Sequence, residues 1–306
     1  MKIQKFSATF IALIQLCARL AQAAYDGNID TKYQGQILYS NLDCRKEKPV
    51  FYIFKLDGVL YVSTRGSSDA ADFATDVIFE ETKTDYGIFH TGFFDAASFV
   101  YDSLKNYLDD STEVRLVGHS YGAAVSQVLH VMLHRYNPSV RVTSFAFAPV
   151  PSMNQIADDE VRDDMYAFVN DDDIIPTLSI PNCYKKFTFL FPTLHNIPSD
   201  TIIEKVDGLL KIIKFTSILD EGTFNMIWDA VPIIVINAKA YEEDVPKYVR
   251  YVSGKVYQLK AGRPKALSRA LINQEIFLDE LSVTLNCISD HLMANYIKVV
   301  DEIIEG

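Results

Sequence analysis

The chain has 306 residues, 49% of them hydrophobic, which is enough to bury the core of one large domain. Its 29 basic and 40 acidic residues give a net charge of −11, which excludes binding of nucleic acid or of an anionic membrane by net charge alone. The four cysteines lack Cys-x-x-Cys spacing, so the sequence indicates neither a zinc site nor a redox pair and leaves a disulfide open.

The N-terminal run supports two interpretations. Two lysines, an apolar run over residues 6–18 and small residues at 21–23 are typical of a secretory signal with its cleavage site. Gln15, Arg19 and Gln22, however, share one helical face, opposite an apolar face, as in an amphipathic helix that is retained. We favour a retained helix over residues 1–24, ahead of a single domain over 25–306, and therefore a cytoplasmic location over secretion. The run is too short and too often interrupted to span a membrane.

Residues 60–65 have the pattern of a strand, and the small residues 66–68 follow it as a turn. A loop of small residues after a strand can direct a backbone N–H at a developing oxyanion. Ser67 would offer its N–H and its hydroxyl. We therefore expect Ser67 to contribute to an oxyanion hole.

The most informative motif is Gly-His-Ser-Tyr-Gly at residues 118–122. A short apolar strand is predicted over 113–117 and a helix over 123–136, so the motif has the context of a nucleophile elbow. The turn is tight enough that a Cβ at either glycine would collide with the neighbouring strand or helix. Ser120 is therefore the predicted nucleophile, and the N–H of Tyr121 is the predicted second oxyanion donor.

A serine hydroxyl needs a histidine to take its proton and an acid to orient that histidine. A strand is predicted over 165–169, and three aspartates follow it. Asp173 directly precedes the apolar residues 174–176, which would press its carboxylate into the protein, whereas Asp171 and Asp172 should face water. Asp173 is therefore the predicted acid.

Proteins with a nucleophile elbow carry their catalytic residues in the chain order serine, acid, histidine. Two of the six histidines, His195 and His291, come late enough in the chain to be the base. His195 has no suitable placement. His291 follows Ser289 and Asp290, either of which would cap a final helix that begins beside the carboxyl edge of the sheet. His291 is therefore the predicted base.

The chain resembles the class 3 lipases, the fungal-lipase-like group that includes diacylglycerol lipases. The order and rough spacing of the motifs agree from about residue 20 to the end of the chain. The motifs are Thr-Arg-Gly-Ser-Ser (64–68), His-Thr-Gly-Phe (90–93), Gly-His-Ser-Tyr-Gly (118–122), Phe-Ala-Phe-Ala-Pro (145–149), Asp-Ile-Ile-Pro (173–176) and Asp-His (290–291).

The resemblance implies an α/β-hydrolase fold, with a mostly parallel central sheet flanked by helices, and carboxylic-ester hydrolysis without a cofactor or metal. Motif by motif, it implies the same nucleophile, acid, base and oxyanion donors as the residues themselves. The leading helix of the family also resembles residues 16–25, which supports a retained helix.

The sequence departs from the family in three places. Ala148 stands where the family usually has a glycine. An insertion at about 199–241, before the C-terminal histidine, has apolar residues at helical spacing, and we expect a helical cap over the acyl-binding side; an extra pair of core helices remote from the site is the alternative. The lid, at 68–75, contains one large apolar residue, Phe73, and two aspartates, so we expect little jump in rate at a lipid interface.

The leading hypothesis is a serine esterase or lipase that hydrolyses acyl esters, such as the acylglycerols, through an acyl-enzyme. Two alternatives remain open: an esterase of soluble esters, and a lipase-like binding protein without turnover. Peripheral contact with a membrane is also left open. If the chain attaches to a membrane, we expect the insertion to be the attached part.

Overall fold

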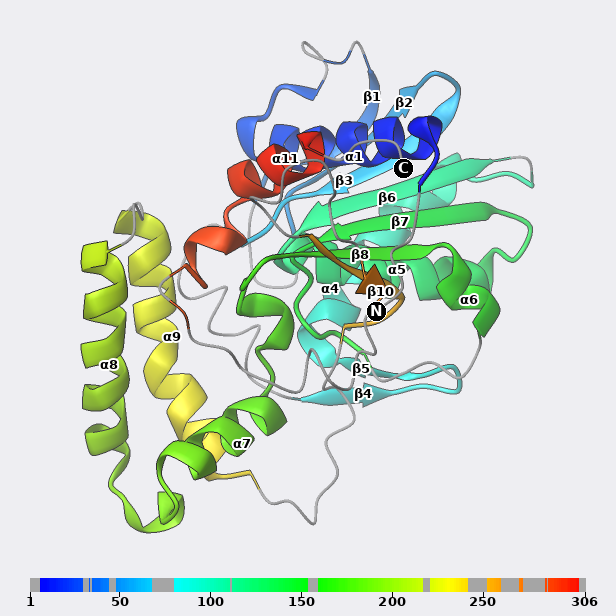
Figure 1. Cartoon of the computed structure of the whole chain (residues 1–306). Helices are drawn as coiled ribbons and strands as arrows, with labels where there is room; N and C mark the ends of the chain where they lie inside the picture. Colours follow the sequence, from blue (N-terminus) through cyan, green and yellow to red (C-terminus); the bar gives the residue numbers. More distant parts are fainter. Residues whose placement is uncertain are drawn as a thin grey trace.

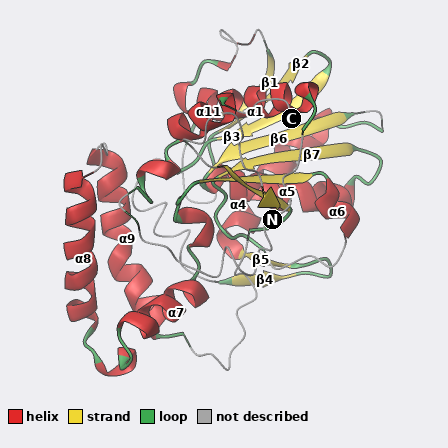
Figure 2. Cartoon of the chain, in the orientation of Figure 1, coloured by secondary structure: helices red, strands yellow, loops and turns green. Residues whose placement is uncertain are grey.

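The computed structural model of the chain describes residues 6–29, 33, 35–43, 48–67, 80–110, 112–153, 159–216, 221–241, 252–259, 270–271, 284 and 286–302. Within these residues, eight strands form one central sheet in the order β1-β2-β3-β6-β7-β8-β9-β10, with helices on both faces (Figures 1 and 2). The predicted α/β-hydrolase architecture is confirmed.

The middle of the sheet is parallel, and its two edges are antiparallel. Strands β3, β6, β7, β8 and β9 run parallel, whereas β1 and β2 at one edge and β10 at the other run antiparallel to their neighbours. Parallel strands covered on both faces carry near-continuous apolar runs, and the last four residues of β6 and of β7 are all buried. The strands are β1 (Gln36–Asn41), β2 (Phe51–Leu56), β3 (Val59–Thr64), β6 (Glu113–His119), β7 (Arg141–Phe147), β8 (Met165–Asn170), β9 (Lys255–Leu259) and β10 (Ala270–Leu271), with β4 (Glu81–Lys83) and β5 (Ile88–His90) in a separate pair.

Helices bury the two faces of the sheet in separate clusters. On one face, α4 (Thr91–Leu104) and α5 (Tyr121–Tyr136) pack against the sheet and against each other. On the other face lie α1 (Ala8–Asp26) and α11 (Met293–Asp301), the first and last helices of the described chain. The short α6 (Asp159–Asp163) precedes β8. The two ends of the described chain are therefore neighbours on one face.

Helix α1 is amphipathic in the way the sequence indicates. Ser7 accepts a hydrogen bond from the N–H of Phe10 at its start, and Gly27, with φ 66°, ends it in the left-handed region. The expected apolar face is buried, and Ser63 of β3 donates a hydrogen bond of 3.0 Å to the carbonyl of Leu20. Helix α1 is thus part of the hydrophobic core.

The expectation that the N-terminal run is too short to span a membrane is wrong with respect to its length. Helix α1 has 19 residues and is long and apolar enough to cross a bilayer by length and composition. In this fold, however, its apolar residues pack against the sheet and α11.

The insertion is helical, as predicted. Helices α8 (Ser199–Thr216) and α9 (Glu221–Lys239) form a hairpin, and α9 also packs against α7 (Ile180–Leu190). The hairpin stands on the side of the sheet at which the parallel strands end, with α8 outermost (Figure 1). The buried side chains of both helices join the cluster that contains α4 and α5.

Candidate active site

Ser120 occupies a strained turn between β6 and α5. Its backbone has φ 56° and ψ −123°, a conformation that is costly for a residue with a Cβ. The N–H of Ser120 donates to the carbonyl of Phe147 at 2.9 Å, and its own carbonyl accepts from the N–H groups of Ala123 and Ala124 at 3.0 and 3.1 Å. The first turn of α5 and strand β7 therefore hold the serine in this conformation.

The two glycines of the motif are required by close approach. A Cβ at Gly118 would lie 2.2 Å from the carbonyl oxygen of Gly122, in the helix. A Cβ at Gly122 would lie 2.2 Å from the carbonyl oxygen of Thr64, in the neighbouring strand β3. Both distances are far inside van der Waals contact, so any other residue at either position would displace the backbone that carries Ser120.

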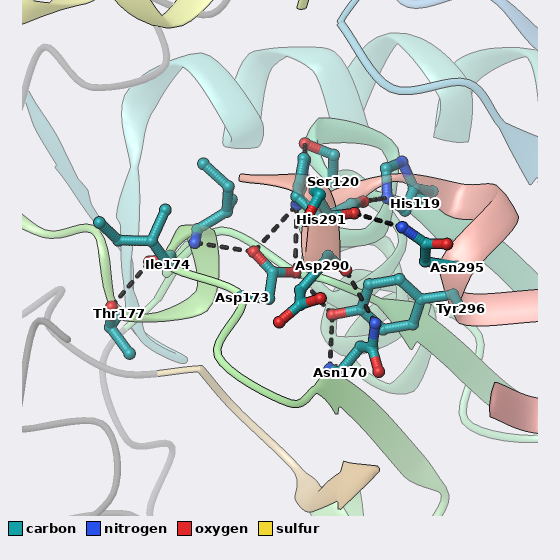
Figure 3. Close-up of polar contacts among 12 residues, drawn as sticks. His119, Ser120, Asn170, Asp173, Ile174, Thr177, Asp290, His291, Asn295 and Tyr296 are labelled. Atoms are coloured by element: carbon teal, nitrogen blue, oxygen red, sulfur yellow. Dashed lines mark hydrogen bonds and ion pairs between the residues drawn. The ribbon is translucent and has the colours of Figure 1, made fainter. Parts of the chain in front are cut away.

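The structure brings Ser120, His291 and Asp173 together from three distant parts of the sequence (Figure 3). Nε2 of His291 lies 3.0 Å from Oγ of Ser120, and Nδ1 of His291 lies 3.2 and 3.1 Å from the two carboxylate oxygens of Asp173. The three residues are 4%, 4% and 3% exposed, respectively for serine, histidine and aspartate. This is the chain of contacts by which an imidazole takes a proton from a serine hydroxyl.

The buried carboxylate of Asp173 has two further donors. The N–H of Ile175 donates to its Oδ1 at 3.0 Å, and the hydroxyl of Tyr296 donates to its Oδ2 at 2.6 Å. Burial and the neighbouring Asp173 raise the pKa of Tyr296 well above its usual range, so the hydroxyl stays protonated and remains a donor. The sequence did not identify Tyr296, because nothing local marks a tyrosine in a terminal helix as a partner of Asp173.

His291 lies in a short 3₁₀ turn, η4 (Ser289–His291), ahead of α11. The prediction that Ser289 or Asp290 caps the final helix is wrong, because α11 begins only at Met293 and has no side-chain cap. Asp290 serves a different purpose. Its Oδ2 accepts from the N–H of Asp172 at 3.2 Å, and its carbonyl accepts from the side chain of Asn170 at 3.0 Å. The turn that carries the histidine is therefore tied to the turn that carries the acid.

The Asp290 carboxyl has a raised pKa in this arrangement. Burial, followed by the charges of Asp171, Asp172 and Asp173, raises the pKa of Asp290 to about 6. Of its neighbours, Asp172 is exposed, as predicted, whereas Asp171, which was also predicted to face water, is half-buried.

His119, the residue before the nucleophile, forms a second link to His291. Its Nε2 lies 2.8 Å from the carbonyl oxygen of His291, and its Nδ1 lies 2.9 Å from the hydroxyl of Tyr25. A carbonyl only accepts, so Nε2 carries the proton and Nδ1 accepts from the tyrosine. Burial, together with the neighbouring His291, lowers the pKa of His119 well below its usual range, which keeps it in this neutral form. Chain order excluded His119 as the base, but it gave no hint of this contact.

Tyr25 connects α1 to the loop after β3. Its hydroxyl accepts a hydrogen bond from the N–H of Gly66, and a Cβ at Gly66 would lie 2.0 Å from that hydroxyl. Ser67 is the next residue after Gly66. Strands β3 and β6 pair in parallel, with Thr64 opposite Gly118, and helix α5 begins at Tyr121 just after the end of β6. The two predicted oxyanion donors thus follow the carboxyl ends of neighbouring parallel strands.

The remaining candidates lie elsewhere. His195 is exposed in a turn after α7, and His130 is fully buried in α5, where its Nε2 contacts the carbonyl of Val161. The predicted lid at 68–75, including Phe73, lies outside the described residues.

The described residues contain no group of three or more histidine, cysteine or acidic side chains that could hold a metal ion. Cys17, Cys183 and Cys287 are buried free thiols, and Cys44 lies outside the described residues. The disulfide that the sequence left open is therefore not formed among these three.

The chain is similar to known lipases in two comparisons. The family model described as Lipase (class 3) matches residues 61–183, which include Ser67, Ser120 and Asp173. The triacylglyceride lipase of Rhizomucor miehei is 18% identical, over 58% of this chain and 77% of that one, with a TM-score of 0.48. The lipase of Rhizopus microsporus var. chinensis is 19% identical, over 58% of this chain and 72% of that one, with a TM-score of 0.48. No curated protein matches the chain.

Proposed function

We propose that this chain, whose residues 61–183 match the class 3 lipase family, hydrolyses the ester bonds of acylglycerol lipids. In this proposal Ser120 is the nucleophile, His291 the base and Asp173 the acid that orients the histidine. The contact between the serine hydroxyl and an imidazole that is itself held by a buried carboxylate carries this proposal.

In the first half of the reaction, Oγ of Ser120 attacks the ester carbonyl carbon while Nε2 of His291 takes the hydroxyl proton. Asp173 keeps the imidazole in the productive tautomer and stabilises the imidazolium. The N–H groups of Tyr121 and Ser67 bind the oxyanion, and the N-terminus of α5 adds its dipole there. The intermediate collapses when His291 gives its proton to the leaving alcohol, and an acyl-enzyme remains.

In the second half, a water molecule replaces the alcohol. His291 takes one proton from the water, whose oxygen attacks the acyl carbon, and the same oxyanion donors stabilise the second intermediate. The proton then returns to Oγ of Ser120 as the fatty acid leaves. No group beyond ester and water is consumed.

A fluorophosphonate probe and a series of esters test the proposal. The native chain should be labelled and should hydrolyse diacylglycerol or triacylglycerol, whereas Ser120→Ala should lose the label and about 10⁶ in turnover with its fold intact. Hydrolysis confined to short soluble esters would identify a soluble-ester esterase instead. Failure of the folded native chain to react with any ester or with the probe would identify a binding protein without turnover.

The oxyanion role of Ser67 has its own test. Ser67→Ala removes the hydroxyl but leaves the backbone N–H, so we expect kcat to fall by about 10² to 10³ with KM nearly unchanged. An unchanged kcat would restrict the contribution of Ser67 to its backbone.

We also propose that the α8–α9 hairpin covers the acyl-binding side of the site. Its place beside the carboxyl edge of the sheet, and the packing of α9 against the α7 segment that follows Asp173, support this (Figure 1). A photoreactive acyl ester bound at Ser120 should crosslink to residues of 199–241. Crosslinks that never reach this segment would favour an extra core helix pair remote from the site.

Helix α1, we propose further, belongs to the active enzyme, because it supplies Tyr25 to the His119 and Gly66 contacts and fills one face of the sheet. A chain that begins at residue 25 should be recovered unfolded. A folded, active chain of that length would show that the helix is dispensable.

A further inference from the structure

Helix α7 presents apolar and basic side chains to solvent beside the face that it buries. Cys183 and Phe187 are buried toward the core, whereas Phe189 and Leu190 are 79% and 48% exposed. Each lysine stands four residues before one of these two, so Lys185 lies beside Phe189 and Lys186 lies beside Leu190 on the helix surface. Phe189 is the most exposed of the large hydrophobic residues in the described part of the chain.

Helix α8 also presents basic and apolar side chains to solvent. The ammonium of Lys205 lies 5.0 Å from the centre of the Phe191 ring, which joins α8 to the end of α7. Leu209 and Ile212, at 50% and 56% exposed, are four and seven residues after Lys205 and therefore extend one stripe along the helix. We call these seven residues the α7–α8 surface: Lys185, Lys186, Phe189, Leu190, Lys205, Leu209 and Ile212.

The charge of this surface is opposite to that of the chain. The net charge of the protein is −11, yet residues 174–199 contain no aspartate or glutamate. Helix α8 carries Asp200, Glu204 and Asp207, but helical spacing places them on a different side from Lys205, Leu209 and Ile212. Exposed apolar side chains among lysines, with the acidic residues turned away, are the composition of helices that lie in a membrane interface.

We infer that the α7–α8 surface docks on an anionic lipid surface, with its aromatic and aliphatic side chains in the interface and its lysines at the headgroups. Such docking would place the bilayer on the side of the molecule where the parallel strands end (Figure 1). Ser120 directly follows one of these strands, β6. The inference rests on the proposed function, which puts the substrate in a lipid phase. The inference also attributes membrane attachment to residues near the insertion, because the net negative charge of the whole chain would repel an anionic membrane.

The test is sedimentation of the Ser120→Ala chain with vesicles, because that variant leaves the lipid intact. One set of vesicles is phosphatidylcholine alone, and the other contains about one third phosphatidylserine. The chain should bind the anionic vesicles more tightly, and high salt should weaken this binding. Replacing Phe189 and Leu190 together by serine should weaken binding to both sets at least about tenfold. Lys185→Gln and Lys186→Gln should each cost about fivefold on the anionic set alone.

Matched controls lie on other parts of the surface. Leu42 is 65% exposed, and Lys55 is exposed on β2, so Leu42→Ser and Lys55→Gln should leave binding unchanged. Absence of binding to the anionic vesicles, or binding that survives the α7 substitutions, would overturn the inference. So would self-association of the chain that the α7 substitutions abolish, without vesicle binding, since a second copy would then be the occupant.

Hydrolysis of a short soluble ester by the chain with Ser120 intact separates the two proposals. The α7 substitutions should leave that rate unchanged, because these residues touch none of the reacting groups. A chain that hydrolyses the soluble ester but ignores vesicles refutes the docking alone, and a chain that binds vesicles but hydrolyses nothing refutes the enzymatic function alone.

Discussion

Replacement of Tyr296 by phenylalanine tests how the carboxylate of Asp173 is held. The hydroxyl of Tyr296 is fully buried; it donates to Oδ2 of Asp173 at 2.6 Å and accepts from the N–H of Asn170 at 2.9 Å. The substitution removes both hydrogen bonds and adds no atom. The substitution therefore tests the contribution of the Tyr296 hydroxyl while the carboxylate of Asp173 is kept.

The expected cost can be worked out for stability and for rate. The lost bond to an ionised partner is worth about 1.5–3 kcal/mol, and the N–H of Asn170 is left buried without its acceptor, so the free energy of unfolding should fall by about 2–4 kcal/mol. Asp173 keeps its bonds to the N–H of Ile175 and to His291. We therefore expect kcat to fall only about tenfold, or about 1.4 kcal/mol of transition-state stabilisation.

The assay combines urea unfolding with the rate on a soluble ester. Tyr61→Phe is the matched control, because the hydroxyl of Tyr61 is also a hydrogen-bond partner of a charged group, Arg115 at 2.6 Å, on β3 and β6 away from Asp173. The control should lose stability but keep kcat. If Tyr296→Phe loses the same stability and keeps kcat within twofold, Tyr296 supports the fold and does not position the acid.

Three further predictions concern the turns around the site. Asp173→Asn should reduce kcat by about 10⁴, because the amide holds the wrong tautomer, while Asp171→Asn and Asp172→Asn stay within a few-fold; a large loss at Asp172 would shift the acid by one residue. The raised pKa of Asp290, about 6, means that the folded state holds this proton more tightly than the unfolded chain, so its stabilising contribution is full below about pH 4 and is lost as the pH rises through 6. The fall of Tm between pH 4 and 6 should accordingly be smaller in Asp290→Asn, and an unaltered profile would contradict the assignment. Ala148 has φ 52°, so Ala148→Gly relieves about 1–2 kcal/mol of strain against an entropy cost of about 0.5–1, and urea unfolding should show a gain of about 0.5–1 kcal/mol; a loss would mean that the alanine methyl packs favourably.

Local sequence was sufficient for the elements that carry the site, and the reason is steric. Gly118 and Gly122 are spaced so that a serine between them can turn sharply, and the structure shows that neither position has room for a Cβ. The apolar residues after Asp173 predicted its burial, and chain order reduced the candidates for the base to His195 and His291. The departure at Ala148 was also visible, although only the structure shows that the position has a left-handed backbone.

The sequence expectations that were wrong concern features that tertiary contacts decide. The sequence placed Ser289 and Asp290 as helix caps, because residues of these types often begin helices, but tertiary contacts with the Asp172 turn use Asp290 instead. The bounds of helix α1 also differ from the expected 1–24, because Ser7 and Gly27 cap it and it packs on the sheet. The contacts of Tyr25 with His119 and of Tyr296 with Asp173 join residues far apart in the chain, which no local pattern records.

By itself, then, the sequence determined the chemistry available: a serine on an elbow, an acid after a strand and a histidine near the end of the chain. Strand and helix patterns are local, so they can be read one segment at a time. Tertiary structure alone decided the contacts that hold these residues: Tyr296 with Asp173, His119 with the backbone of His291, and Tyr25 with His119. It also decided that Phe189 and Leu190 face solvent, because burial depends on what packs against a helix and not on the helix itself.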